Sequence, residues 1–178
     1  MKSEVLKKSE AHKVFNDIVL KNEIVIFGST YMEEFPFYEL EHKYLLSNAI
    51  YNRSITSLTT EEALEILDFS VFGARPAKIF YALGECDISY DDSFISTYED
   101  ILKKTKKVLP QSKIYVLSVP SDDEKTNVNH RLSALCKSLD AEFIPINYKS
   151  SYSSIFRRLS PFFRSKALTF LEAFKMAE

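Results

Sequence analysis

The sequence predicts an α/β protein in which helices cover both faces of a mainly parallel, five-stranded sheet, giving three layers. Two observations lead to this prediction. Four apolar runs are continuous rather than alternating, as expected for strands that are buried on both faces. Segments with helical spacing separate these runs, and a helix between two strands joins them in parallel by a right-handed crossover.

The predicted strands are rich in β-branched and aromatic residues. The four clear ones are EIVIFG at 23–28, KIFYAL at 78–83, KIYVLSV at 113–119 and EFIPIN at 142–147. AIYNRSI at 49–55 is a weaker fifth candidate, because its centre is polar.

Helical patterns precede, separate and follow these strands. Thr59 with Glu62 and Ser121 with Glu124 match the capping box that marks the start of a helix. Residues 1–20 are expected to form an N-terminal helical extension that carries Val14, Phe15, Ile18 and Val19. The other apolar faces are Phe94, Tyr98, Ile101 and Leu102; Val128, Leu132, Leu135, Cys136 and Leu139; and Phe163, Ala167, Phe170, Leu171 and Phe174.

Length and composition narrow the class of protein. With 178 residues, 46% of them hydrophobic and 27% charged, the chain fits a single globular domain over 1–178. A net charge of −2 gives no general attraction to nucleic acid or to an anionic membrane, so neither is expected as a partner. No apolar run is long enough to span a bilayer, and the first fifteen residues are too charged for a signal peptide.

The cysteines and glycines are few enough to be informative. Cys86 and Cys136 form no metal-like or disulfide-rich pattern, which indicates reduced thiols in a cytoplasmic protein. No motif implies a metal or an organic cofactor. Of the three glycines, Gly28 ends the first predicted strand and Gly84 directly follows the strand at 78–83. In parallel sheets ligands bind beyond the carboxyl ends of the strands. We therefore expect a site built from residues 28–30, 52–57, 84–87 and 118–121 and from the segment after residue 147.

Three of these loops, in this order, resemble the sequence blocks of the SGNH/GDSL hydrolases, whose fold is a flavodoxin-like α/β/α sandwich. IVIFGSTYMEE is similar to the Gly-Asp-Ser block, with Thr30 at the nucleophile position and Ser29 at that of the aspartate. YNRSITSLTTEEAL is similar to the second block, with Ser54 and Ser57 in place of glycines, and KIFYALGECDIS to the third, with Cys86 in place of asparagine. The resemblance covers roughly residues 23–147 and implies an acyl esterase.

The catalytic groups that the resemblance implies are missing. The family activates its serine with a histidine, which an aspartate three residues earlier holds in a loop before the last helix. Here that loop is taken as YKSSYSSIFRRLSPFFRSKALTF, which has Ile155 at the aspartate position and Arg158 at that of the histidine. An arginine stays protonated and cannot accept the proton. Cys86 offers only a weak S–H donor to an oxyanion, whereas Ser57 can still present its backbone N–H.

We therefore expect an SGNH-fold protein that is catalytically impaired and that binds a ligand or a protein partner at the former esterase site. A small-molecule ester, an acetylated sugar or an anion fits such a site, with Gly28, Gly84, Asp87 and Arg158 contributing to binding. The alternative is an active acyl esterase or O-acetyl hydrolase that uses Thr30 or Ser29 as nucleophile and His130 as base. A Rossmann-type nucleotide site is disfavoured, since the first loop has one glycine where that fingerprint has three.

Several other features are expected to have structural rather than catalytic roles. Asp87 is expected to brace its own loop, and His12, His42 and His130 are expected to be solvated or capping residues. The arginines of SIFRRLSPFFRSK are expected to point outward while its phenylalanines pack inward. Residues 35–46 could form either a lid over the first loop or part of the core.

Overall fold

The computed structural model describes residues 2–120 and 127–164, and they form a five-stranded, entirely parallel sheet between two layers of helices. The strands are β1 (Ile24–Gly28), β2 (Ile50–Asn52), β3 (Lys78–Ala82), β4 (Lys113–Leu117) and β5 (Glu142–Ile144). They lie in the order β2-β1-β3-β4-β5. The predicted three-layer fold and the strand at 49–55 are thereby confirmed.

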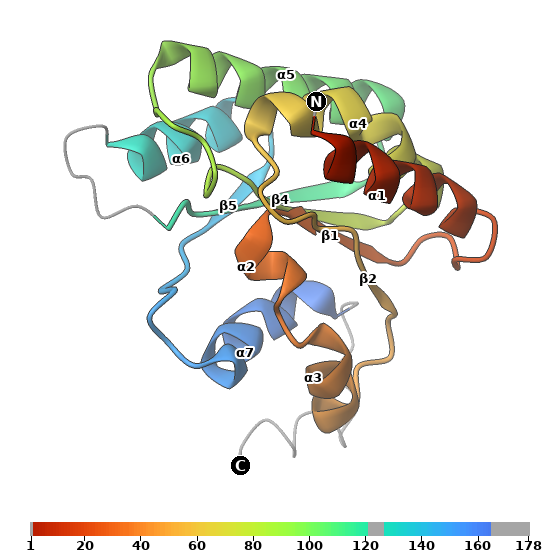
Figure 1. Ribbon diagram of the computed structural model, residues 1–178. Helices are drawn as coiled ribbons and strands as arrows, with labels where there is room; N and C mark the ends of the chain where they lie inside the picture. Colours follow the sequence, from red (N-terminus) through yellow and green to blue (C-terminus); the bar gives the residue numbers. More distant parts are fainter. Residues whose placement is uncertain (1, 121–126, 165–178) are drawn as a thin grey trace.

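Helices cover both faces of the sheet, as Figure 1 shows. One layer consists of α1 (Ser3–Phe15), α4 (Thr60–Ser70), α5 (Asp92–Val108) and α6 (Val128–Ser138), and the other of α2 (Thr30–Glu33), α3 (Phe37–Tyr44) and α7 (Tyr152–Phe163). A short 3₁₀ turn, η1 (Phe72–Ala74), follows α4.

Alternating strand residues feed the two cores, because successive side chains of a strand point to opposite faces. On β1, Val25 and Phe27 face the layer with α4 and α5, while Ile24 and Ile26 face the layer with α3 and α7. All four are essentially inaccessible to solvent. This double burial explains why the strands are continuously apolar in sequence.

Several helix predictions are confirmed. Thr59 and Glu62 make the reciprocal hydrogen bonds of a capping box at the start of α4. On α5 the predicted apolar face is buried, and on α6 Val128, Leu132 and Cys136 are buried. The second capping box, Ser121 with Glu124, and the helical face from Ala167 to Phe174 lie outside the described residues.

The prediction for the N-terminal helix is wrong in detail. Helix α1 ends at Phe15, so Ile18 and Val19 lie beyond it, and Val14 and Phe15 are exposed. The buried face is made instead by Val5, Ser9 and His12, which recur at helical spacing toward α4. Contact with α4 determines which face of α1 is buried. Ser9 and His12 can be buried there because both side chains are hydrogen-bonded.

The segment after β5 also differs from its expected form. Residues 152–163, taken from the sequence as part of a loop, form α7, whose N-cap is Ser151. Phe156, Leu159 and Phe163 are fully buried, while Arg157 and Arg158 are exposed, as the outward-arginine interpretation predicts. For Arg164 the prediction is wrong, because this residue is buried. At the other end of the helix, the Lys78 ammonium donates to the carbonyl oxygens of Phe162, Phe163 and Arg164. Lysine at a helix C-terminus satisfies carbonyls that lack partners within the helix.

Residues 35–46 belong to the core rather than to a lid. Phe35, Phe37, Leu40 and Tyr44 are buried in the layer with α7. In the described part of the chain, no helix is long and apolar enough to cross a membrane.

Candidate functional site

The candidate site lies at the carboxyl ends of β1, β2 and β3, where the three predicted loops meet. Main-chain hydrogen bonds join the loops directly: the Ile55 N–H donates to the Gly28 carbonyl (3.0 Å), and the Ser29 N–H donates to the Ala82 carbonyl (3.3 Å). These bonds continue the sheet pairing past the last residues of the strands. The first and second loops are therefore held by backbone geometry rather than by side chains alone.

The two glycines are required by close packing. A Cβ on Gly28 would lie 2.7 Å from the Ala82 carbonyl oxygen, which is backbone and cannot easily move. Gly84 has φ +106°, and a Cβ there would lie 2.8 Å from a methyl group of Val119. Only glycine adopts such a φ at little cost. Both glycines therefore let the neighbouring segments approach one another closely.

Two hydroxyls and a thiol form the centre of the site. Ser29 Oγ lies 2.9 Å and Thr30 Oγ1 3.8 Å from Cys86 Sγ. Ser29 is fully buried, whereas Thr30, the first residue of α2, is partly accessible. Of the two predicted nucleophiles, only Thr30 can therefore meet a ligand without rearrangement.

Ser57 occupies the position of a family glycine and has a glycine-like conformation, with φ +59°. Its backbone N–H, the predicted oxyanion donor, donates to Thr30 Oγ1 (3.0 Å). Its carbonyl accepts from the Lys2 ammonium (2.5 Å). The threonine hydroxyl thus uses one of its lone pairs to accept this bond.

Replacing Ser57 by glycine is expected to raise the free energy of unfolding by about 0.5–1 kcal/mol, because the left-handed conformation is strained for a residue with a Cβ. Chemical denaturation measures the change. The matched variant Ser57→Ala keeps the Cβ and should show no such gain. Equal effects of the two substitutions would contradict the role assigned to backbone strain.

No histidine is hydrogen-bonded to this centre, and all three histidines of the chain belong to its described part. His12 Nδ1 lies 3.0 Å from Ser70 Oγ between α1 and α4, and His42 Nδ1 donates to the Tyr38 carbonyl (2.9 Å). Burial lowers the pKa of His12 to about 4, and the charges of Arg53 and Lys8 act in the same direction. His130 is exposed on α6. His12 is thus buried and neutral, contrary to the expectation of a solvated or capping residue.

The predicted register of the catalytic loop needs correction. Ile155 and Arg158 do not lie in a loop before a helix but inside α7, where Ile155 is buried. The exposed Arg158 donates from Nε to the Pro145 carbonyl (2.6 Å) and so links α7 to the segment that follows β5. The loop that precedes α7 is PINYKSS at 145–151, and it contains neither a histidine nor an acidic residue.

Asp87 braces a different element from the one expected. Its carboxylate accepts from the Thr60 N–H (3.1 Å) and the Thr60 hydroxyl (2.8 Å), so it ties the third loop to the start of α4 rather than to itself. Burial raises the pKa of Asp87, and the Thr60 hydrogen bonds oppose this rise. A cavity of about 290 Å³ lies beside it, lined among others by Thr59, Ser89 and Ser93.

Sequence reasoning missed the groups at the rim of the site. The Glu85 carboxylate accepts from the Tyr31 N–H (2.9 Å), and the Tyr31 ring packs edge-on against Tyr148, with 4.9 Å between centroids. The ring centroids of Tyr152 and Tyr31 lie 5.9 Å apart. Burial raises the pKa of Tyr31, and Tyr152 and Glu85 add to the effect. The one feature of the sequence that could have pointed to this rim is the position of Glu85 inside the third block.

A second missed group joins three segments. The Glu33 carboxylate of α2 accepts from the Thr56 hydroxyl and pairs with the Lys8 ammonium of α1. Among the described residues, no group of three or more His, Cys, Asp or Glu side chains is arranged to hold a metal ion.

Comparison with solved structures finds the same fold in proteins whose descriptions include GDSL-like lipases, an acylhydrolase and esterases. No family model and no curated protein matches the sequence. A Streptococcus pneumoniae protein, provisionally described as a platelet activating factor, superposes with a TM-score of 0.76 at 21% identity, over 90% of this chain and 93% of that one. A Bacteroides fragilis protein, provisionally described as an acylhydrolase, gives 0.62 at 16% identity, over 76% and 75%.

The likeness extends to an acetylxylan esterase. A catalytic mutant of that enzyme from Geobacillus stearothermophilus superposes with a TM-score of 0.56 at 9% identity, over 78% of this chain and 82% of that one. The chain thus has the fold that the sequence blocks predict.

Proposed function

We propose that this SGNH-fold protein has lost efficient ester hydrolysis and binds a small polar ligand at the former esterase site. The observation that carries the proposal is that no imidazole is hydrogen-bonded to Thr30, Ser29 or Cys86. An alcohol is a weak nucleophile at neutral pH unless a neighbouring base takes its proton. With donors such as the Ser57 N–H around it, Thr30 has partners for its lone pairs but no base for its proton.

Oxyanion stabilisation is reduced as well. Cys86 stands where the family has an asparagine, and a thiol is a much weaker donor than an amide. Loss of one oxyanion donor costs roughly 10²–10³ in rate in enzymes of this kind. Together with the missing base, this loss favours binding over turnover.

The ligand classes that fit are a small-molecule ester, an acetylated sugar or another hydroxyl-rich compound. Support comes from the accessible hydroxyl of Thr30 at the centre and from the aromatic and acidic rim formed by Tyr31, Tyr152 and Glu85. Tyrosine rings offer an apolar face with a polar tip, which suits a partly polar ligand. An anion held by Arg158 has less support, because that side chain already bonds Pro145.

Hydrolysis of p-nitrophenyl acetate tests the proposal. We expect the wild-type protein to show no turnover beyond that of Thr30→Ala and Ser29→Ala, with Ser153→Ala as a control that removes a hydroxyl from α7. Turnover that disappears in Thr30→Ala but persists in the control would overturn the proposal. So would an organophosphonate adduct on Thr30, detected by intact-protein mass spectrometry.

The same assay decides the alternative of an active acyl esterase or O-acetyl hydrolase. That alternative needs a base for Thr30 or Ser29, such as His130, which is exposed on α6. It therefore predicts turnover that His130→Gln abolishes and that His42→Gln leaves unchanged.

A further inference from the structure

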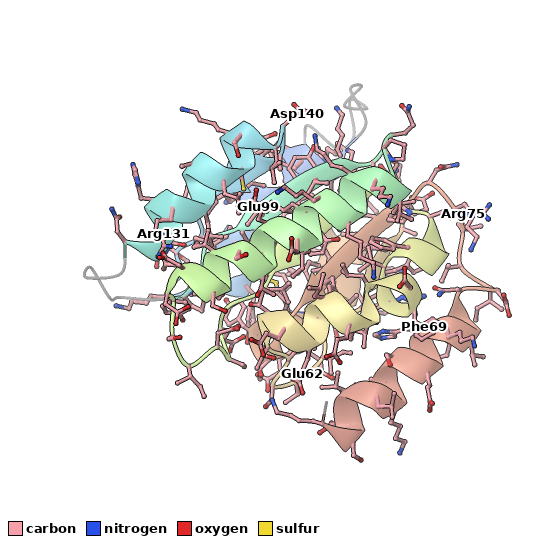
Figure 2. The ribbon with its side chains drawn as sticks, turned by 90° about the horizontal axis from the view of Figure 1, so that it is seen from above. Glu62, Phe69, Arg75, Glu99, Arg131 and Asp140 are labelled. Carbon is pink, nitrogen blue, oxygen red and sulfur yellow. The ribbon has the colours of Figure 1, made fainter. Side chains whose placement is uncertain are left out.

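Helix α1 reaches from the surface of α4 to the loop that carries Ser57. Figure 2 shows α1 beside α4, with Glu62 near the first residues of α1 and Phe69 toward its other end. The Lys2 N–H donates to Glu62 Oε1 (2.9 Å), and the Asn16 amide donates to the Phe69 carbonyl (2.8 Å). The helix is thus attached to α4 at both ends.

Buried contacts also fix the middle of α1. Val5 is completely inaccessible and belongs to the core beneath α4 and α5. His12 bonds Ser70, and the Arg53 guanidinium donates to the His12 carbonyl (3.3 Å). Because it is held along its whole length, α1 can serve as a rigid support for residues that contact it.

Lys8 on α1 and Lys2, the residue that precedes the helix, contact the candidate site from this support. The Lys2 ammonium donates to the Ser57 carbonyl, on the peptide that follows the one whose N–H bonds Thr30. The Lys8 ammonium pairs with Glu33, whose other carboxylate oxygen accepts from Thr56. The Glu33 side chain is 24% exposed and that of Lys8 is 35% exposed, so both are partly screened from water.

The Glu33 carboxylate therefore sits where three elements meet. Glu33 lies on the short helix α2, which begins at Thr30, while Thr56 is the residue before Ser57. The Glu33 carboxylate thus connects three elements: α2, which carries the Thr30 hydroxyl; the loop that carries the Ser57 N–H; and the rigid helix α1.

We propose that Lys8 and Glu33 are positioning residues of the candidate site: through them α1 fixes the direction of the Ser57 N–H relative to the Thr30 hydroxyl. Neither residue touches a ligand in this role. The inference concerns the geometry of the site and holds whether or not the site hydrolyses esters. Its failure and the failure of the proposed function are therefore separate outcomes.

The effect should be local. An ion pair that is partly open to solvent contributes little to global stability, so its removal should free the loop without unfolding the protein. Amide-to-water hydrogen exchange at Ser57, measured by NMR on ¹⁵N-labelled protein, reports this directly.

We expect Lys8→Met and Glu33→Gln each to speed exchange at Ser57 by about three- to tenfold and to shift its amide resonance. The double variant should exceed neither single variant, because both changes break the same connection. Lys8→Arg should restore wild-type exchange. Lys7→Met, which removes an exposed charge one residue away on α1, is the matched control.

Unchanged exchange at Ser57 in both Lys8→Met and Glu33→Gln would overturn the inference. Equally accelerated exchange at Ser57 in Lys7→Met would also overturn it. The same holds if exchange speeds up at all amides in proportion to a lower unfolding temperature, because that pattern indicates a merely structural role. Should one variant fail to fold, the other gives the same readout.

Discussion

Replacing Phe156 by alanine is expected to lower the free energy of unfolding by about 3–5 kcal/mol. The side chain is completely buried between α7 and the sheet. Its ring stacks on Tyr44, with 5.4 Å between centroids and 17° between planes, and it lies 5.5 Å from the ring of Phe163. Alanine would remove these contacts and leave a cavity that neighbouring rings can fill only in part.

Urea denaturation followed by far-ultraviolet circular dichroism measures the loss. Tyr152→Ala is the control on the same helix: its side chain is 42% exposed, and its removal should cost less than about 1.5 kcal/mol. An equally small loss for Phe156→Ala would mean that α7 does not pack on the sheet as described.

Lowering the pH from 7 to 4 is expected to remove up to about 3 kcal/mol of stability through His12 alone. In the folded protein burial lowers the pKa of His12 to about 4, whereas in the unfolded chain it takes its ordinary value of about 6.5. Between these values the unfolded state binds more protons, so stability falls as the pH falls. The contribution is fully present above about pH 6.5 and is lost toward pH 4.

The variant His12→Gln isolates this effect. Although glutamine gives up some packing at neutral pH, its stability should change much less between pH 7 and pH 4 than that of the wild type. His42→Gln, at an exposed position on α3, should keep the wild-type pH dependence. If the wild type and His12→Gln lose the same free energy over this range, His12 does not carry the pH dependence.

The sequence was informative wherever one local pattern decides a structure. Continuous apolar runs predicted the strands because both faces of the sheet are covered, and Thr59 with Glu62 predicted the start of α4 because both partners lie within one turn. The N-terminal helix was predicted, but its buried face was not, because Val14 and Phe15 are exposed while Ser9 and His12 are buried. Only the tertiary contact distinguishes the two faces.

In the candidate site, too, features set by local sequence or by topology were predictable, whereas features set by tertiary contacts were not. The meeting of the three loops follows from parallel topology and was predictable. The serine itself gives no signal for the positive φ of Ser57, and only its alignment with a family glycine pointed to that conformation. Lys8, Glu33 and Thr56 come from three separate segments, so no spacing in the sequence relates them. The start of α7 was missed because serines occupy several neighbouring positions, any of which could cap a helix.

The bond network of Lys78 has a consequence for biosynthesis. Its ammonium closes the end of α7, which is translated long after β3, the strand that begins with this lysine. A nascent chain that has left the ribosome only as far as β5 therefore still lacks the part of the cover over Phe80, Leu117 and Ile144 that α7 provides. Because transiently exposed apolar surface promotes aggregation, we expect the nascent chain to need protection until α7 packs on the sheet.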